Sequence, residues 1–227
     1  CLGGFHPTLY PLETLAQPTV DYVIFGEGEF TLVELVDALA GGAGDLRGIQ
    51  GLGFKGPQGA LRNDPRPLTA SLDEITHADY ALVDYTKYCH VIGNPGANLA
   101  IESSRGCPFA CAFCDIRRTK FRYRTPALVV DVIERWYRAG VRSFFFVDDN
   151  LTVIKDRANE ICRLIVDRRL KIDFKVSSRV DTVNEEVLRN LKRAGCSRLS
   201  LGIESSQQKN LDFLGKGVKE AQIVSTL

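Results

Sequence analysis

Three cysteines stand within eight residues in the stretch RGCPFACAFCD, at Cys107, Cys111 and Cys114. Thiolates are soft ligands that select iron–sulfur clusters or zinc over hard cations. A structural metal site normally completes its coordination sphere with a fourth protein ligand, whereas a catalytic metal keeps one position open for a reactant. The count of three therefore indicates a metal centre with an open position.

Two other uses of the three thiols stay open at this point. A structural zinc site would need a fourth ligand, for which the neighbouring Cys89 and His90 are candidates, although zinc sites favour paired CxxC knuckles. An electron-transfer module would instead hold an iron–sulfur cluster whose irons are all ligated by protein. Neither alternative leaves a position for a reactant.

Composition places the chain among ordinary globular proteins. Its 227 residues are 44% hydrophobic and 25% charged, which allows one large domain or two small ones. The net charge of +1 does not favour nucleic acid or an anionic membrane as partner. The sequence contains no apolar run of membrane-spanning length and no signal peptide, so a cytoplasmic protein with reduced thiols is expected. Because the chain starts at Cys1 and contains no methionine, we expect an internal piece of a longer protein.

The first part of the chain is typical of the end of an α/β unit. Residues 1–42 contain a glycine turn at LGGFHPT, a short helix at PLETLAQ, a strand at DYVIFG and an amphipathic helix at TLVELVDALAGG. Residues 43–96 are expected to form a linker. Within it, GLGF and ALRN flank KGPQG as a hairpin, and the remainder wraps one domain against the next.

From residue 97 to residue 227 strands and helices alternate. The expected strands are ANLAIESS, SFFFVDD, IDFKVSS and SRLSLGIE, and the expected helices are TPALVVDVIERWYRAG, RANEICRLIVDRRL and NEEVLRNLKRAG. Such alternation predicts a parallel sheet with crossover helices. About four βα units are present, roughly half of a complete eight-fold barrel of about 250 residues.

Polar groups follow each of the four expected strands. In parallel α/β folds, sites form at the carboxyl ends of the strands. The groups found there are the cysteine loop, Asp148–Asn150, Ser177–Arg179 and Glu204–Ser206. Any one of them could be a helix cap or a turn residue. Their coincidence around a metal-binding loop favours a site.

The spacing Cys107-x3-Cys111-x2-Cys114, with Phe113 before the last cysteine, resembles the radical S-adenosylmethionine (radical SAM) superfamily. The resemblance runs from about Ala97 to the end and includes GIESSQQKNLDFLGKG. It implies a partial (β/α) barrel in which three thiolates hold a [4Fe–4S] cluster and the fourth iron binds the amino and carboxylate groups of S-adenosylmethionine. An electron from the cluster would cleave the sulfonium to methionine and a 5′-deoxyadenosyl radical, which abstracts hydrogen from the substrate.

The same resemblance assigns further residues to S-adenosylmethionine, and no catalytic residue beyond the three cluster ligands. The backbone around Phe113 would contact adenine, and Asp148 and Asp149 would bind the amino group. Ser177 and Arg179 would face the ribose or the carboxylate, and Glu204 the ribose or the methionine moiety.

The segment GGFHPT followed by VDYVIFGEGEFTLVELVDAL resembles the last part of a Rossmann-like, flavodoxin-like cobalamin-binding domain. In that resemblance Gly3, Gly4 and His6 line the side of the corrinoid's nucleotide tail. The alternative interpretation is that the two glycines form a turn and His6 is a loop residue. The implied enzyme is a cobalamin-dependent methyltransferase or cyclase acting on a small molecule or biosynthetic intermediate, with flavodoxin or ferredoxin as electron donor. A radical SAM enzyme without cobalamin, similar to methylthiotransferases, is the alternative.

A cluster of cations follows the cysteine loop, interleaved with Phe121 and Tyr123. It could attract an anionic or nucleic-acid substrate, but a solvated stretch is the simpler expectation given the neutral total charge. Its members are Arg117, Arg118, Lys120, Arg122 and Arg124.

Overall fold

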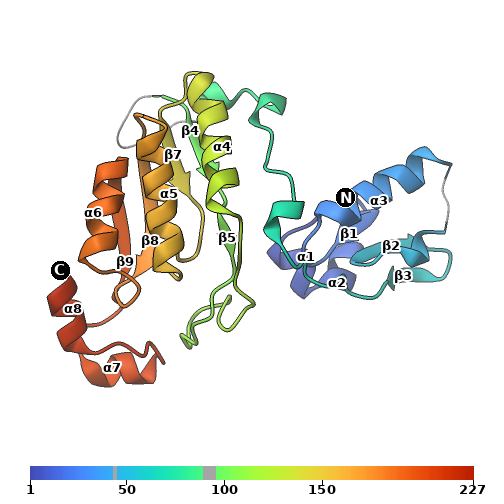
Figure 1. Cartoon of the computed structure of the whole chain (residues 1–227). Coiled ribbons are helices and arrows are strands. Elements are labelled where there is room, and N and C mark those ends of the chain that lie inside the picture. Colours follow the sequence, from blue (N-terminus) through green and yellow to red (C-terminus); the bar gives the residue numbers. More distant parts are fainter. Residues whose placement is uncertain (43–44, 89–95) are drawn as a thin grey trace. The chain divides into compact units, whose positions relative to one another are not determined.

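A computed structural model of the chain describes residues 1–42, 45–88 and 96–227. It contains two compact units, Cys1–Ala70 and Ser71–Leu227 (Figure 1). The expected domain boundaries near residues 42 and 96 differ from this division, because the first part of the expected linker packs within the first unit. No helix among the described residues is long and apolar enough to cross a membrane.

The first unit is built on a three-stranded antiparallel sheet. The hairpin expected around KGPQG forms, and its first strand pairs with the strand of DYVIFG, so that Phe54 lies opposite Tyr22 and Leu61. The strands are β1 (Tyr22–Ile24), β2 (Leu52–Gly56) and β3 (Gly59–Arg62), in the order β1-β2-β3. The helices are α1 (Phe5–Leu9), α2 (Pro11–Leu15), α3 (Glu29–Ala40) and the 3-10 turn η1 (Leu46–Gly48). The glycine turn expected at LGGFHPT is therefore shorter than predicted, because α1 begins at Phe5.

The second unit contains the predicted parallel sheet. All neighbouring pairs are parallel, and Phe144 lies between Leu99 and Phe174 in register. The strands are β4 (Asn98–Ile101), β7 (Ser143–Phe146), β8 (Asp173–Arg179) and β9 (Cys196–Gly202), in the order β4-β7-β8-β9. The carboxyl ends of the four strands consequently lie at one edge of the sheet.

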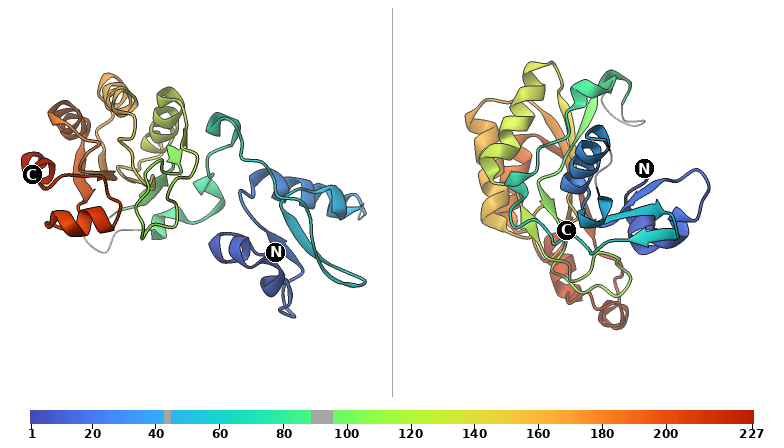
Figure 2. Two further views of the ribbon diagram at one scale, coloured as in Figure 1. Left: turned by 90° about the horizontal axis from the view of Figure 1, so that it is seen from below. Right: turned by 90° about the vertical axis from the view of Figure 1, so that its right-hand side faces the viewer.

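Three helices cover one face of this sheet (Figure 2). They are α4 (Pro126–Arg138), α5 (Lys155–Asp167) and α6 (Glu185–Ala194). Ile133 and Ile161 are buried against Phe144 and Phe174 in the core between helices and sheet. Burying each such side chain contributes roughly 1.5–3 kcal/mol relative to exposure, so this layer fixes the strand ends in place.

Local sequence signals set the helix bounds. Pro126 occupies the first turn of α4, where its missing N–H has no intrahelical partner to lose. The Asn184 side chain accepts a 2.9 Å hydrogen bond from the Val187 N–H at the start of α6. Gly195 ends α6 with φ of 106°, and a Cβ there would lie 2.2 Å from the Ile172 carbonyl oxygen, so only glycine fits.

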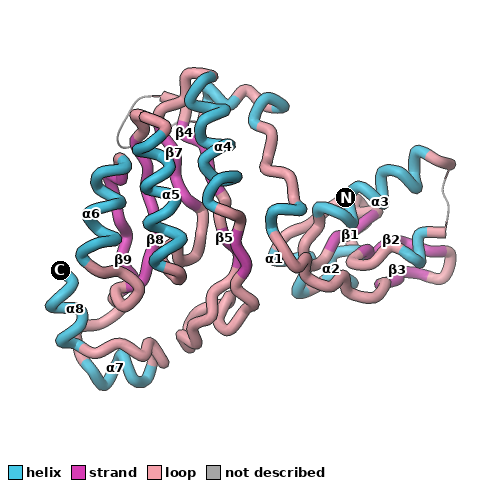
Figure 3. Tube along the Cα trace, in the orientation of Figure 1, coloured by secondary structure: helices cyan, strands magenta, loops and turns pink. Residues whose placement is uncertain are grey.

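The remaining elements connect and flank the sheet (Figure 3). Tyr80 and Tyr85 pack edge-on against Trp136 of α4, and the Tyr80 hydroxyl donates to the Ala100 carbonyl of β4 over 2.8 Å. These contacts anchor the segment before the barrel. The elements are η2 (Leu72–Glu74), η3 (Tyr80–Leu82), η4 (Tyr85–Lys87), β5 (Ser104–Arg105), β6 (Arg122–Tyr123), α7 (Gln208–Phe213) and α8 (Glu220–Thr226).

Candidate functional site

The cysteine loop leaves the end of β4 and is closed at its base by the short antiparallel pair β5–β6. Gly106, with φ of 82°, turns the chain at this base. The Cys107 N–H donates to the Thr119 hydroxyl over 2.8 Å, and the Arg118 N–H donates to the Phe109 carbonyl over 2.8 Å. The loop therefore has a defined backbone conformation of its own.

The segment after α7 supports the tip of the cysteine loop. The Ala112 N–H donates to the Leu214 carbonyl over 2.8 Å. A Cβ at Gly215 would lie 3.2 Å from the Ala110 carbonyl oxygen, so glycine permits this close approach. The C-terminal part of GIESSQQKNLDFLGKG thus packs directly on the loop.

A cavity of about 360 Å³ joins the cysteine loop to the strand ends, a volume within the range of small-molecule sites. The three thiols share its wall with polar groups from the ends of β7, β8 and β9. Its lining residues are Cys107, Cys111, Phe113, Cys114, Ile116, Asp149, Ser177, Ser178, Arg179, Ser200, Leu201, Gly202, Glu204 and Lys216. Most of the residues singled out by sequence therefore meet in one place.

The thiols differ in burial. Cys111 is 7% exposed, whereas Cys107 and Cys114 are half-buried. Burial raises the pKa of the Cys107 thiol, opposed by the Phe109 N–H and the charge of Arg179. Within residues 1–42, 45–88 and 96–227, no three His, Cys, Asp or Glu side chains are already placed to hold one metal ion. This finding concerns a single metal ion, whereas a [4Fe–4S] cluster takes each thiolate on a different iron.

The residues present nevertheless fit an iron–sulfur cluster with a small polar ligand beside it. Three thiolates are the donor set that such clusters require. The Ser178 hydroxyl is buried at the cavity wall and makes no hydrogen bond within the structure, so it can serve a bound molecule. The fourth zinc ligands considered above, Cys89 and His90, lie outside the described residues.

Asp148 has a role within the fold. Its carboxylate is 3% exposed and accepts hydrogen bonds from the Ser103 N–H, the Ser103 hydroxyl and the Ser104 hydroxyl at 2.7, 2.5 and 2.7 Å. Burial raises its pKa, and these hydrogen bonds together with the charge of Arg157 oppose that rise. Asp148 thus ties the end of β4 to the end of β7. Asp148 was predicted to contact S-adenosylmethionine, but the structure shows its carboxylate bonded to these serines. Asp149, its neighbour, lines the cavity.

Arg179 is fixed by several partners at once. It donates to both carboxylate oxygens of Asp181 at 2.9 Å, to the Lys216 carbonyl at 2.6 Å and to the Cys111 sulfur at 3.0 Å. Its guanidinium also lies 3.9 Å from the centroid of the Phe109 ring. The side chain is therefore engaged mainly with the cysteine loop and its supports.

Lys216 is a cavity residue that sequence reasoning missed. Its side chain is 3% exposed, and its ammonium lies 3.1 Å from the Glu204 carboxylate. A Cβ at Gly202 would lie 2.9 Å from the Lys216 nitrogen, so glycine at the strand end leaves room for this pair. The available signal was the motif LGKG, whose two glycines, Gly215 and Gly217, adopt positive φ and turn the lysine inward.

The predicted corrinoid residues lie in the first unit. Gly3, Gly4 and His6 are exposed around the start of α1, and Gly4 has φ of 99°. The His6 ring lies 5.4 Å from the Tyr10 ring. Their assignment to a cobalamin tail stays a prediction.

The expected solvated cation cluster is only partly exposed. Arg122 and Arg124 are 6% and 2% exposed, and Arg124 donates to the Leu72 carbonyl over 2.5 Å. Arg124 thereby ties η2 to the end of β6 at the base of the cysteine loop. The prediction was wrong for these two arginines because their alternating positions in and beside β6 point into the unit.

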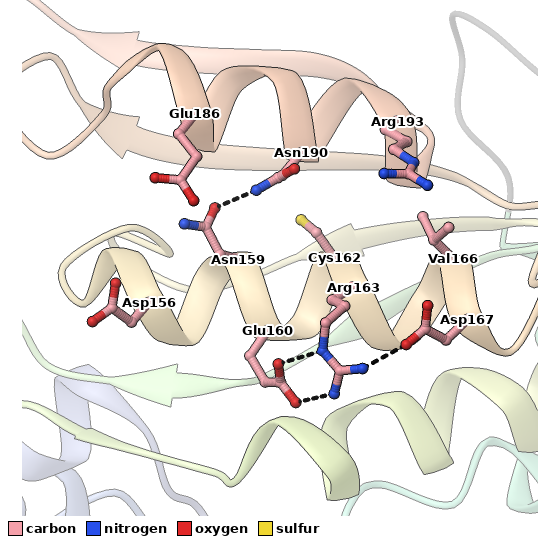
Figure 4. A pocket seen from close by; sticks show the side chains of 10 residues that line it. All are labelled: Asp156, Asn159, Glu160, Cys162, Arg163, Val166, Asp167, Glu186, Asn190 and Arg193. Carbon is pink, nitrogen blue, oxygen red and sulfur yellow. Dashed lines mark hydrogen bonds and ion pairs between the residues drawn. The ribbon is translucent and has the colours of Figure 1, made fainter.

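A second cavity, of about 370 Å³, lies between α5 and α6 (Figure 4). Three of its charged groups pair with one another: Arg163 lies 2.6 Å from Glu160 and 2.5 Å from Asp167. Burial raises the pKa of Cys162 in its wall to about 12, which keeps that thiol neutral. None of the predicted site residues lines this cavity, and its local pairing is typical of a groove between packed helices.

The family comparison agrees with the geometry of the first cavity. A model of the radical SAM superfamily matches residues 101–227, which contain the cysteine loop and all the strand-end groups. This chain belongs to the radical SAM superfamily. Radical SAM proteins use a [4Fe–4S] cluster and S-adenosylmethionine, and the match assigns the second unit to their partial barrel.

Curated relatives of this radical SAM chain include enzymes named for two reactions. An uncharacterized methyltransferase of Pyrococcus horikoshii is 40% identical over all of this chain and half of its own length. An anaerobic magnesium-protoporphyrin IX monomethyl ester cyclase of Synechocystis is 31% identical over 96% of this chain and 44% of its own. The chain spans half or less of the length of these relatives.

Solved radical SAM structures share its fold. TsrM from Kitasatospora setae, with cobalamin and a [4Fe–4S] cluster bound, has a TM-score of 0.73 at 23% identity, covering 99% of this chain and 46% of TsrM. OxsB, with aqua-cobalamin and S-adenosylmethionine bound, has a TM-score of 0.73 at 20% identity, covering 99% of this chain and 33% of OxsB. Because both alignments include the first unit, the order of the two units matches these proteins.

Proposed function

We propose that the protein binds a [4Fe–4S] cluster through Cys107, Cys111 and Cys114 and cleaves S-adenosylmethionine beside it. The observation that carries this proposal is the single cavity shared by the three thiols and the polar ends of β7, β8 and β9. When bound, such a cluster supplies one electron that breaks the bond between sulfur and C5′, giving methionine and a 5′-deoxyadenosyl radical.

The chain's own residues would bind and orient the sulfonium compound. Asp149 and Glu204 offer carboxylate oxygens to its amino group and ribose hydroxyls, and Ser177 and Ser178 offer hydroxyl groups nearby. The buried ammonium of Lys216 offers a charge for its carboxylate. Phe113, which is 53% exposed at the cavity, supplies backbone groups for adenine.

We further propose that the complete protein is a cobalamin-dependent methyltransferase acting on a small-molecule biosynthetic intermediate. The name of the 40% identical relative supports methyl transfer, and the cobalamin bound in TsrM and OxsB supports the second cofactor. Gly3, Gly4 and His6 are the proposed corrinoid neighbours. A cyclase is the second candidate, favoured by the relatives named for ring formation.

The electron is proposed to come from flavodoxin or ferredoxin in the cytoplasm. The three site thiols and Cys1, Cys162 and Cys196 are free in the structure, which suits a reducing compartment.

The test is anaerobic turnover by the full-length protein, reconstituted with iron and sulfide and supplied with cobalamin and a strong reductant. We expect 5′-deoxyadenosine and methionine in equal amounts, and a corrinoid absorbance band that copurifies with the protein. Loss of both products in Cys111→Ala, with retention in Cys1→Ala, would support the cysteine assignment. Cleavage by Cys111→Ala would overturn it, and absence of the corrinoid band would overturn the cobalamin assignment alone.

A further inference from the structure

Arg179 contacts the cysteine loop at the sulfur of Cys111 and at the ring of Phe109. Its Nη1 donates to the Cys111 sulfur at 3.0 Å, and Cys111 is the most buried of the three cysteines, at 7% exposure. A hydrogen bond from a guanidinium to a thiolate is charge-assisted and gains strength away from water. Cys111 is thus a buried thiol whose sulfur receives a hydrogen bond from a guanidinium.

The Arg179 side chain is locked in this position. Asp181 holds Nε and Nη2 in a two-point pair at 2.9 Å, and the Lys216 carbonyl accepts from Nη2 at 2.6 Å. Phe109, itself within the cysteine loop, lies under the guanidinium at 3.9 Å. The Arg179 side chain is 7% exposed, so solvent contributes little screening. With Nε and Nη2 engaged in this way, Nη1 is held beside the Cys111 sulfur.

We propose that Arg179 is a positioning residue that donates a fixed hydrogen bond to the Cys111 ligand and thereby raises the reduction potential of the cluster. This proposal rests on the proposed function, since it requires the cluster to be bound by these cysteines. Reduction adds one electron and hence one negative charge to the cluster. A fixed cationic donor to a ligand sulfur stabilises the reduced form more than the oxidised form, and hydrogen bonds to sulfur are among the factors that set cluster potentials.

Asp181 and Phe109 then act through Arg179. Asp181 is not among the cavity-lining residues, and its carboxylate aims the guanidinium toward the loop. Weakening this pair leaves the thiol donor in place but less firmly held. Its effect on the potential should have the same sign as loss of Arg179 and be smaller.

The experiment measures the midpoint potential of the cluster in the full-length, anaerobically reconstituted protein without S-adenosylmethionine, by redox titration followed by EPR. In Arg179→Gln we expect at least a tenfold lower ratio of reduced to oxidised cluster at a fixed potential, equivalent to a negative shift of about 59 mV for one electron. Arg179→Lys, which keeps the charge without the planar fork, should be intermediate. Asp181→Glu, which keeps the carboxylate charge but disturbs the two-point pair, should shift less than Arg179→Gln in the same direction.

Lys120→Gln is the matched control, because it removes one exposed positive charge from the same loop. It should leave the potential unchanged. Equal shifts in Lys120→Gln and Arg179→Gln would overturn the proposal, since charge alone would then explain them. An unchanged potential in Arg179→Gln would also overturn it, and if that variant assembles no cluster, an unchanged potential in Asp181→Glu decides against it.

Iron content and the response of the wild-type EPR signal to S-adenosylmethionine are measured first. A wild-type protein that binds no cluster contradicts the proposed function itself. A wild-type cluster that responds to S-adenosylmethionine, together with unshifted Arg179 and Asp181 variants, contradicts only the role of Arg179.

Discussion

Replacing Gly106 by alanine should open the base of the cysteine loop. A Cβ at this position would lie 2.5 Å from the Lys120 carbonyl oxygen and 3.0 Å from the Thr119 hydroxyl oxygen. The carbonyl would have to retreat by about 1 Å to reach ordinary contact distance. That movement separates the two segments of the loop base that are joined by the hydrogen bond from the Cys107 N–H to the Thr119 hydroxyl.

Two effects contribute to the expected magnitude. Gly106 has φ of 82°, and forcing a residue with a Cβ into this region costs about 1–2 kcal/mol. Overpacking against a backbone carbonyl adds about 1–3 kcal/mol. Together they amount to about 2–5 kcal/mol, which raises the population of the opened loop by a factor of roughly 30 to more than 1000. Because loops open independently of the core, most of this change should be local.

The assay is hydrogen exchange of the loop amides, combined with iron bound per chain after anaerobic reconstitution. Gly106→Ala should exchange faster in the loop and bind less iron than the wild type. Gly140→Ala is the control: it also has positive φ, at 97°, but nothing lies within 4 Å of its Cβ position. If the loop of Gly106→Ala exchanges no faster than that of Gly140→Ala and iron binding is normal, the reasoning is refuted.

Two further predictions concern stability. Asp148→Ala leaves three buried donors without their acceptor and should lower the free energy of unfolding by about 2–4 kcal/mol. Asp149→Ala should change the free energy of unfolding by less than about 1 kcal/mol. Urea unfolding of both variants checks this, and equal unfolding midpoints would contradict it. Burial, aided by the charge of Arg124, lowers the pKa of His77 from 6.5 to about 4. The carboxylates whose charge opposes this shift are Glu102 and Asp73. As the pH falls, His77 takes up a proton in the unfolded state near pH 6.5 but in the folded state only near pH 4. The contribution of neutral His77 to the free energy of unfolding is therefore complete above about pH 6.5 and is lost as the pH drops toward 4. His77→Gln should flatten that slope, and an unchanged slope would show that other groups cause it.

The sequence was sufficient for the sheet of the second unit, because its signals are local and repeated. The apolar run SFFF and the amphipathic pattern VIERW, with Pro126 at the start of one helix and Gly195 after another, define strands and helices without knowledge of the partner. The parallel order follows from the alternation itself. The cysteine loop was likewise visible from its spacing alone.

Residues whose roles depend on long-range contacts could not be assigned from sequence. Asp148 and Asp149 are adjacent and chemically identical, yet one is buried against Ser103 and the other lines the cavity. Lys216 enters the cavity only because α7 returns the chain to the cysteine loop. Arg124 is buried because the segment before β4 lies against β6. Tertiary packing decides these placements, and of the residues involved only Lys216, between the glycines of LGKG, has a local signal in the sequence.

The central claim is that Cys107, Cys111 and Cys114 together hold one cluster with an open iron for S-adenosylmethionine. The most direct measurement is EPR of the reduced, reconstituted full-length protein with and without S-adenosylmethionine. We predict about four irons per chain, a signal that changes on adding S-adenosylmethionine, and loss of the signal in an alanine variant of each of the three cysteines but not in Cys1→Ala. A cluster whose signal ignores S-adenosylmethionine, or one that persists when any of the three is replaced, would contradict the account.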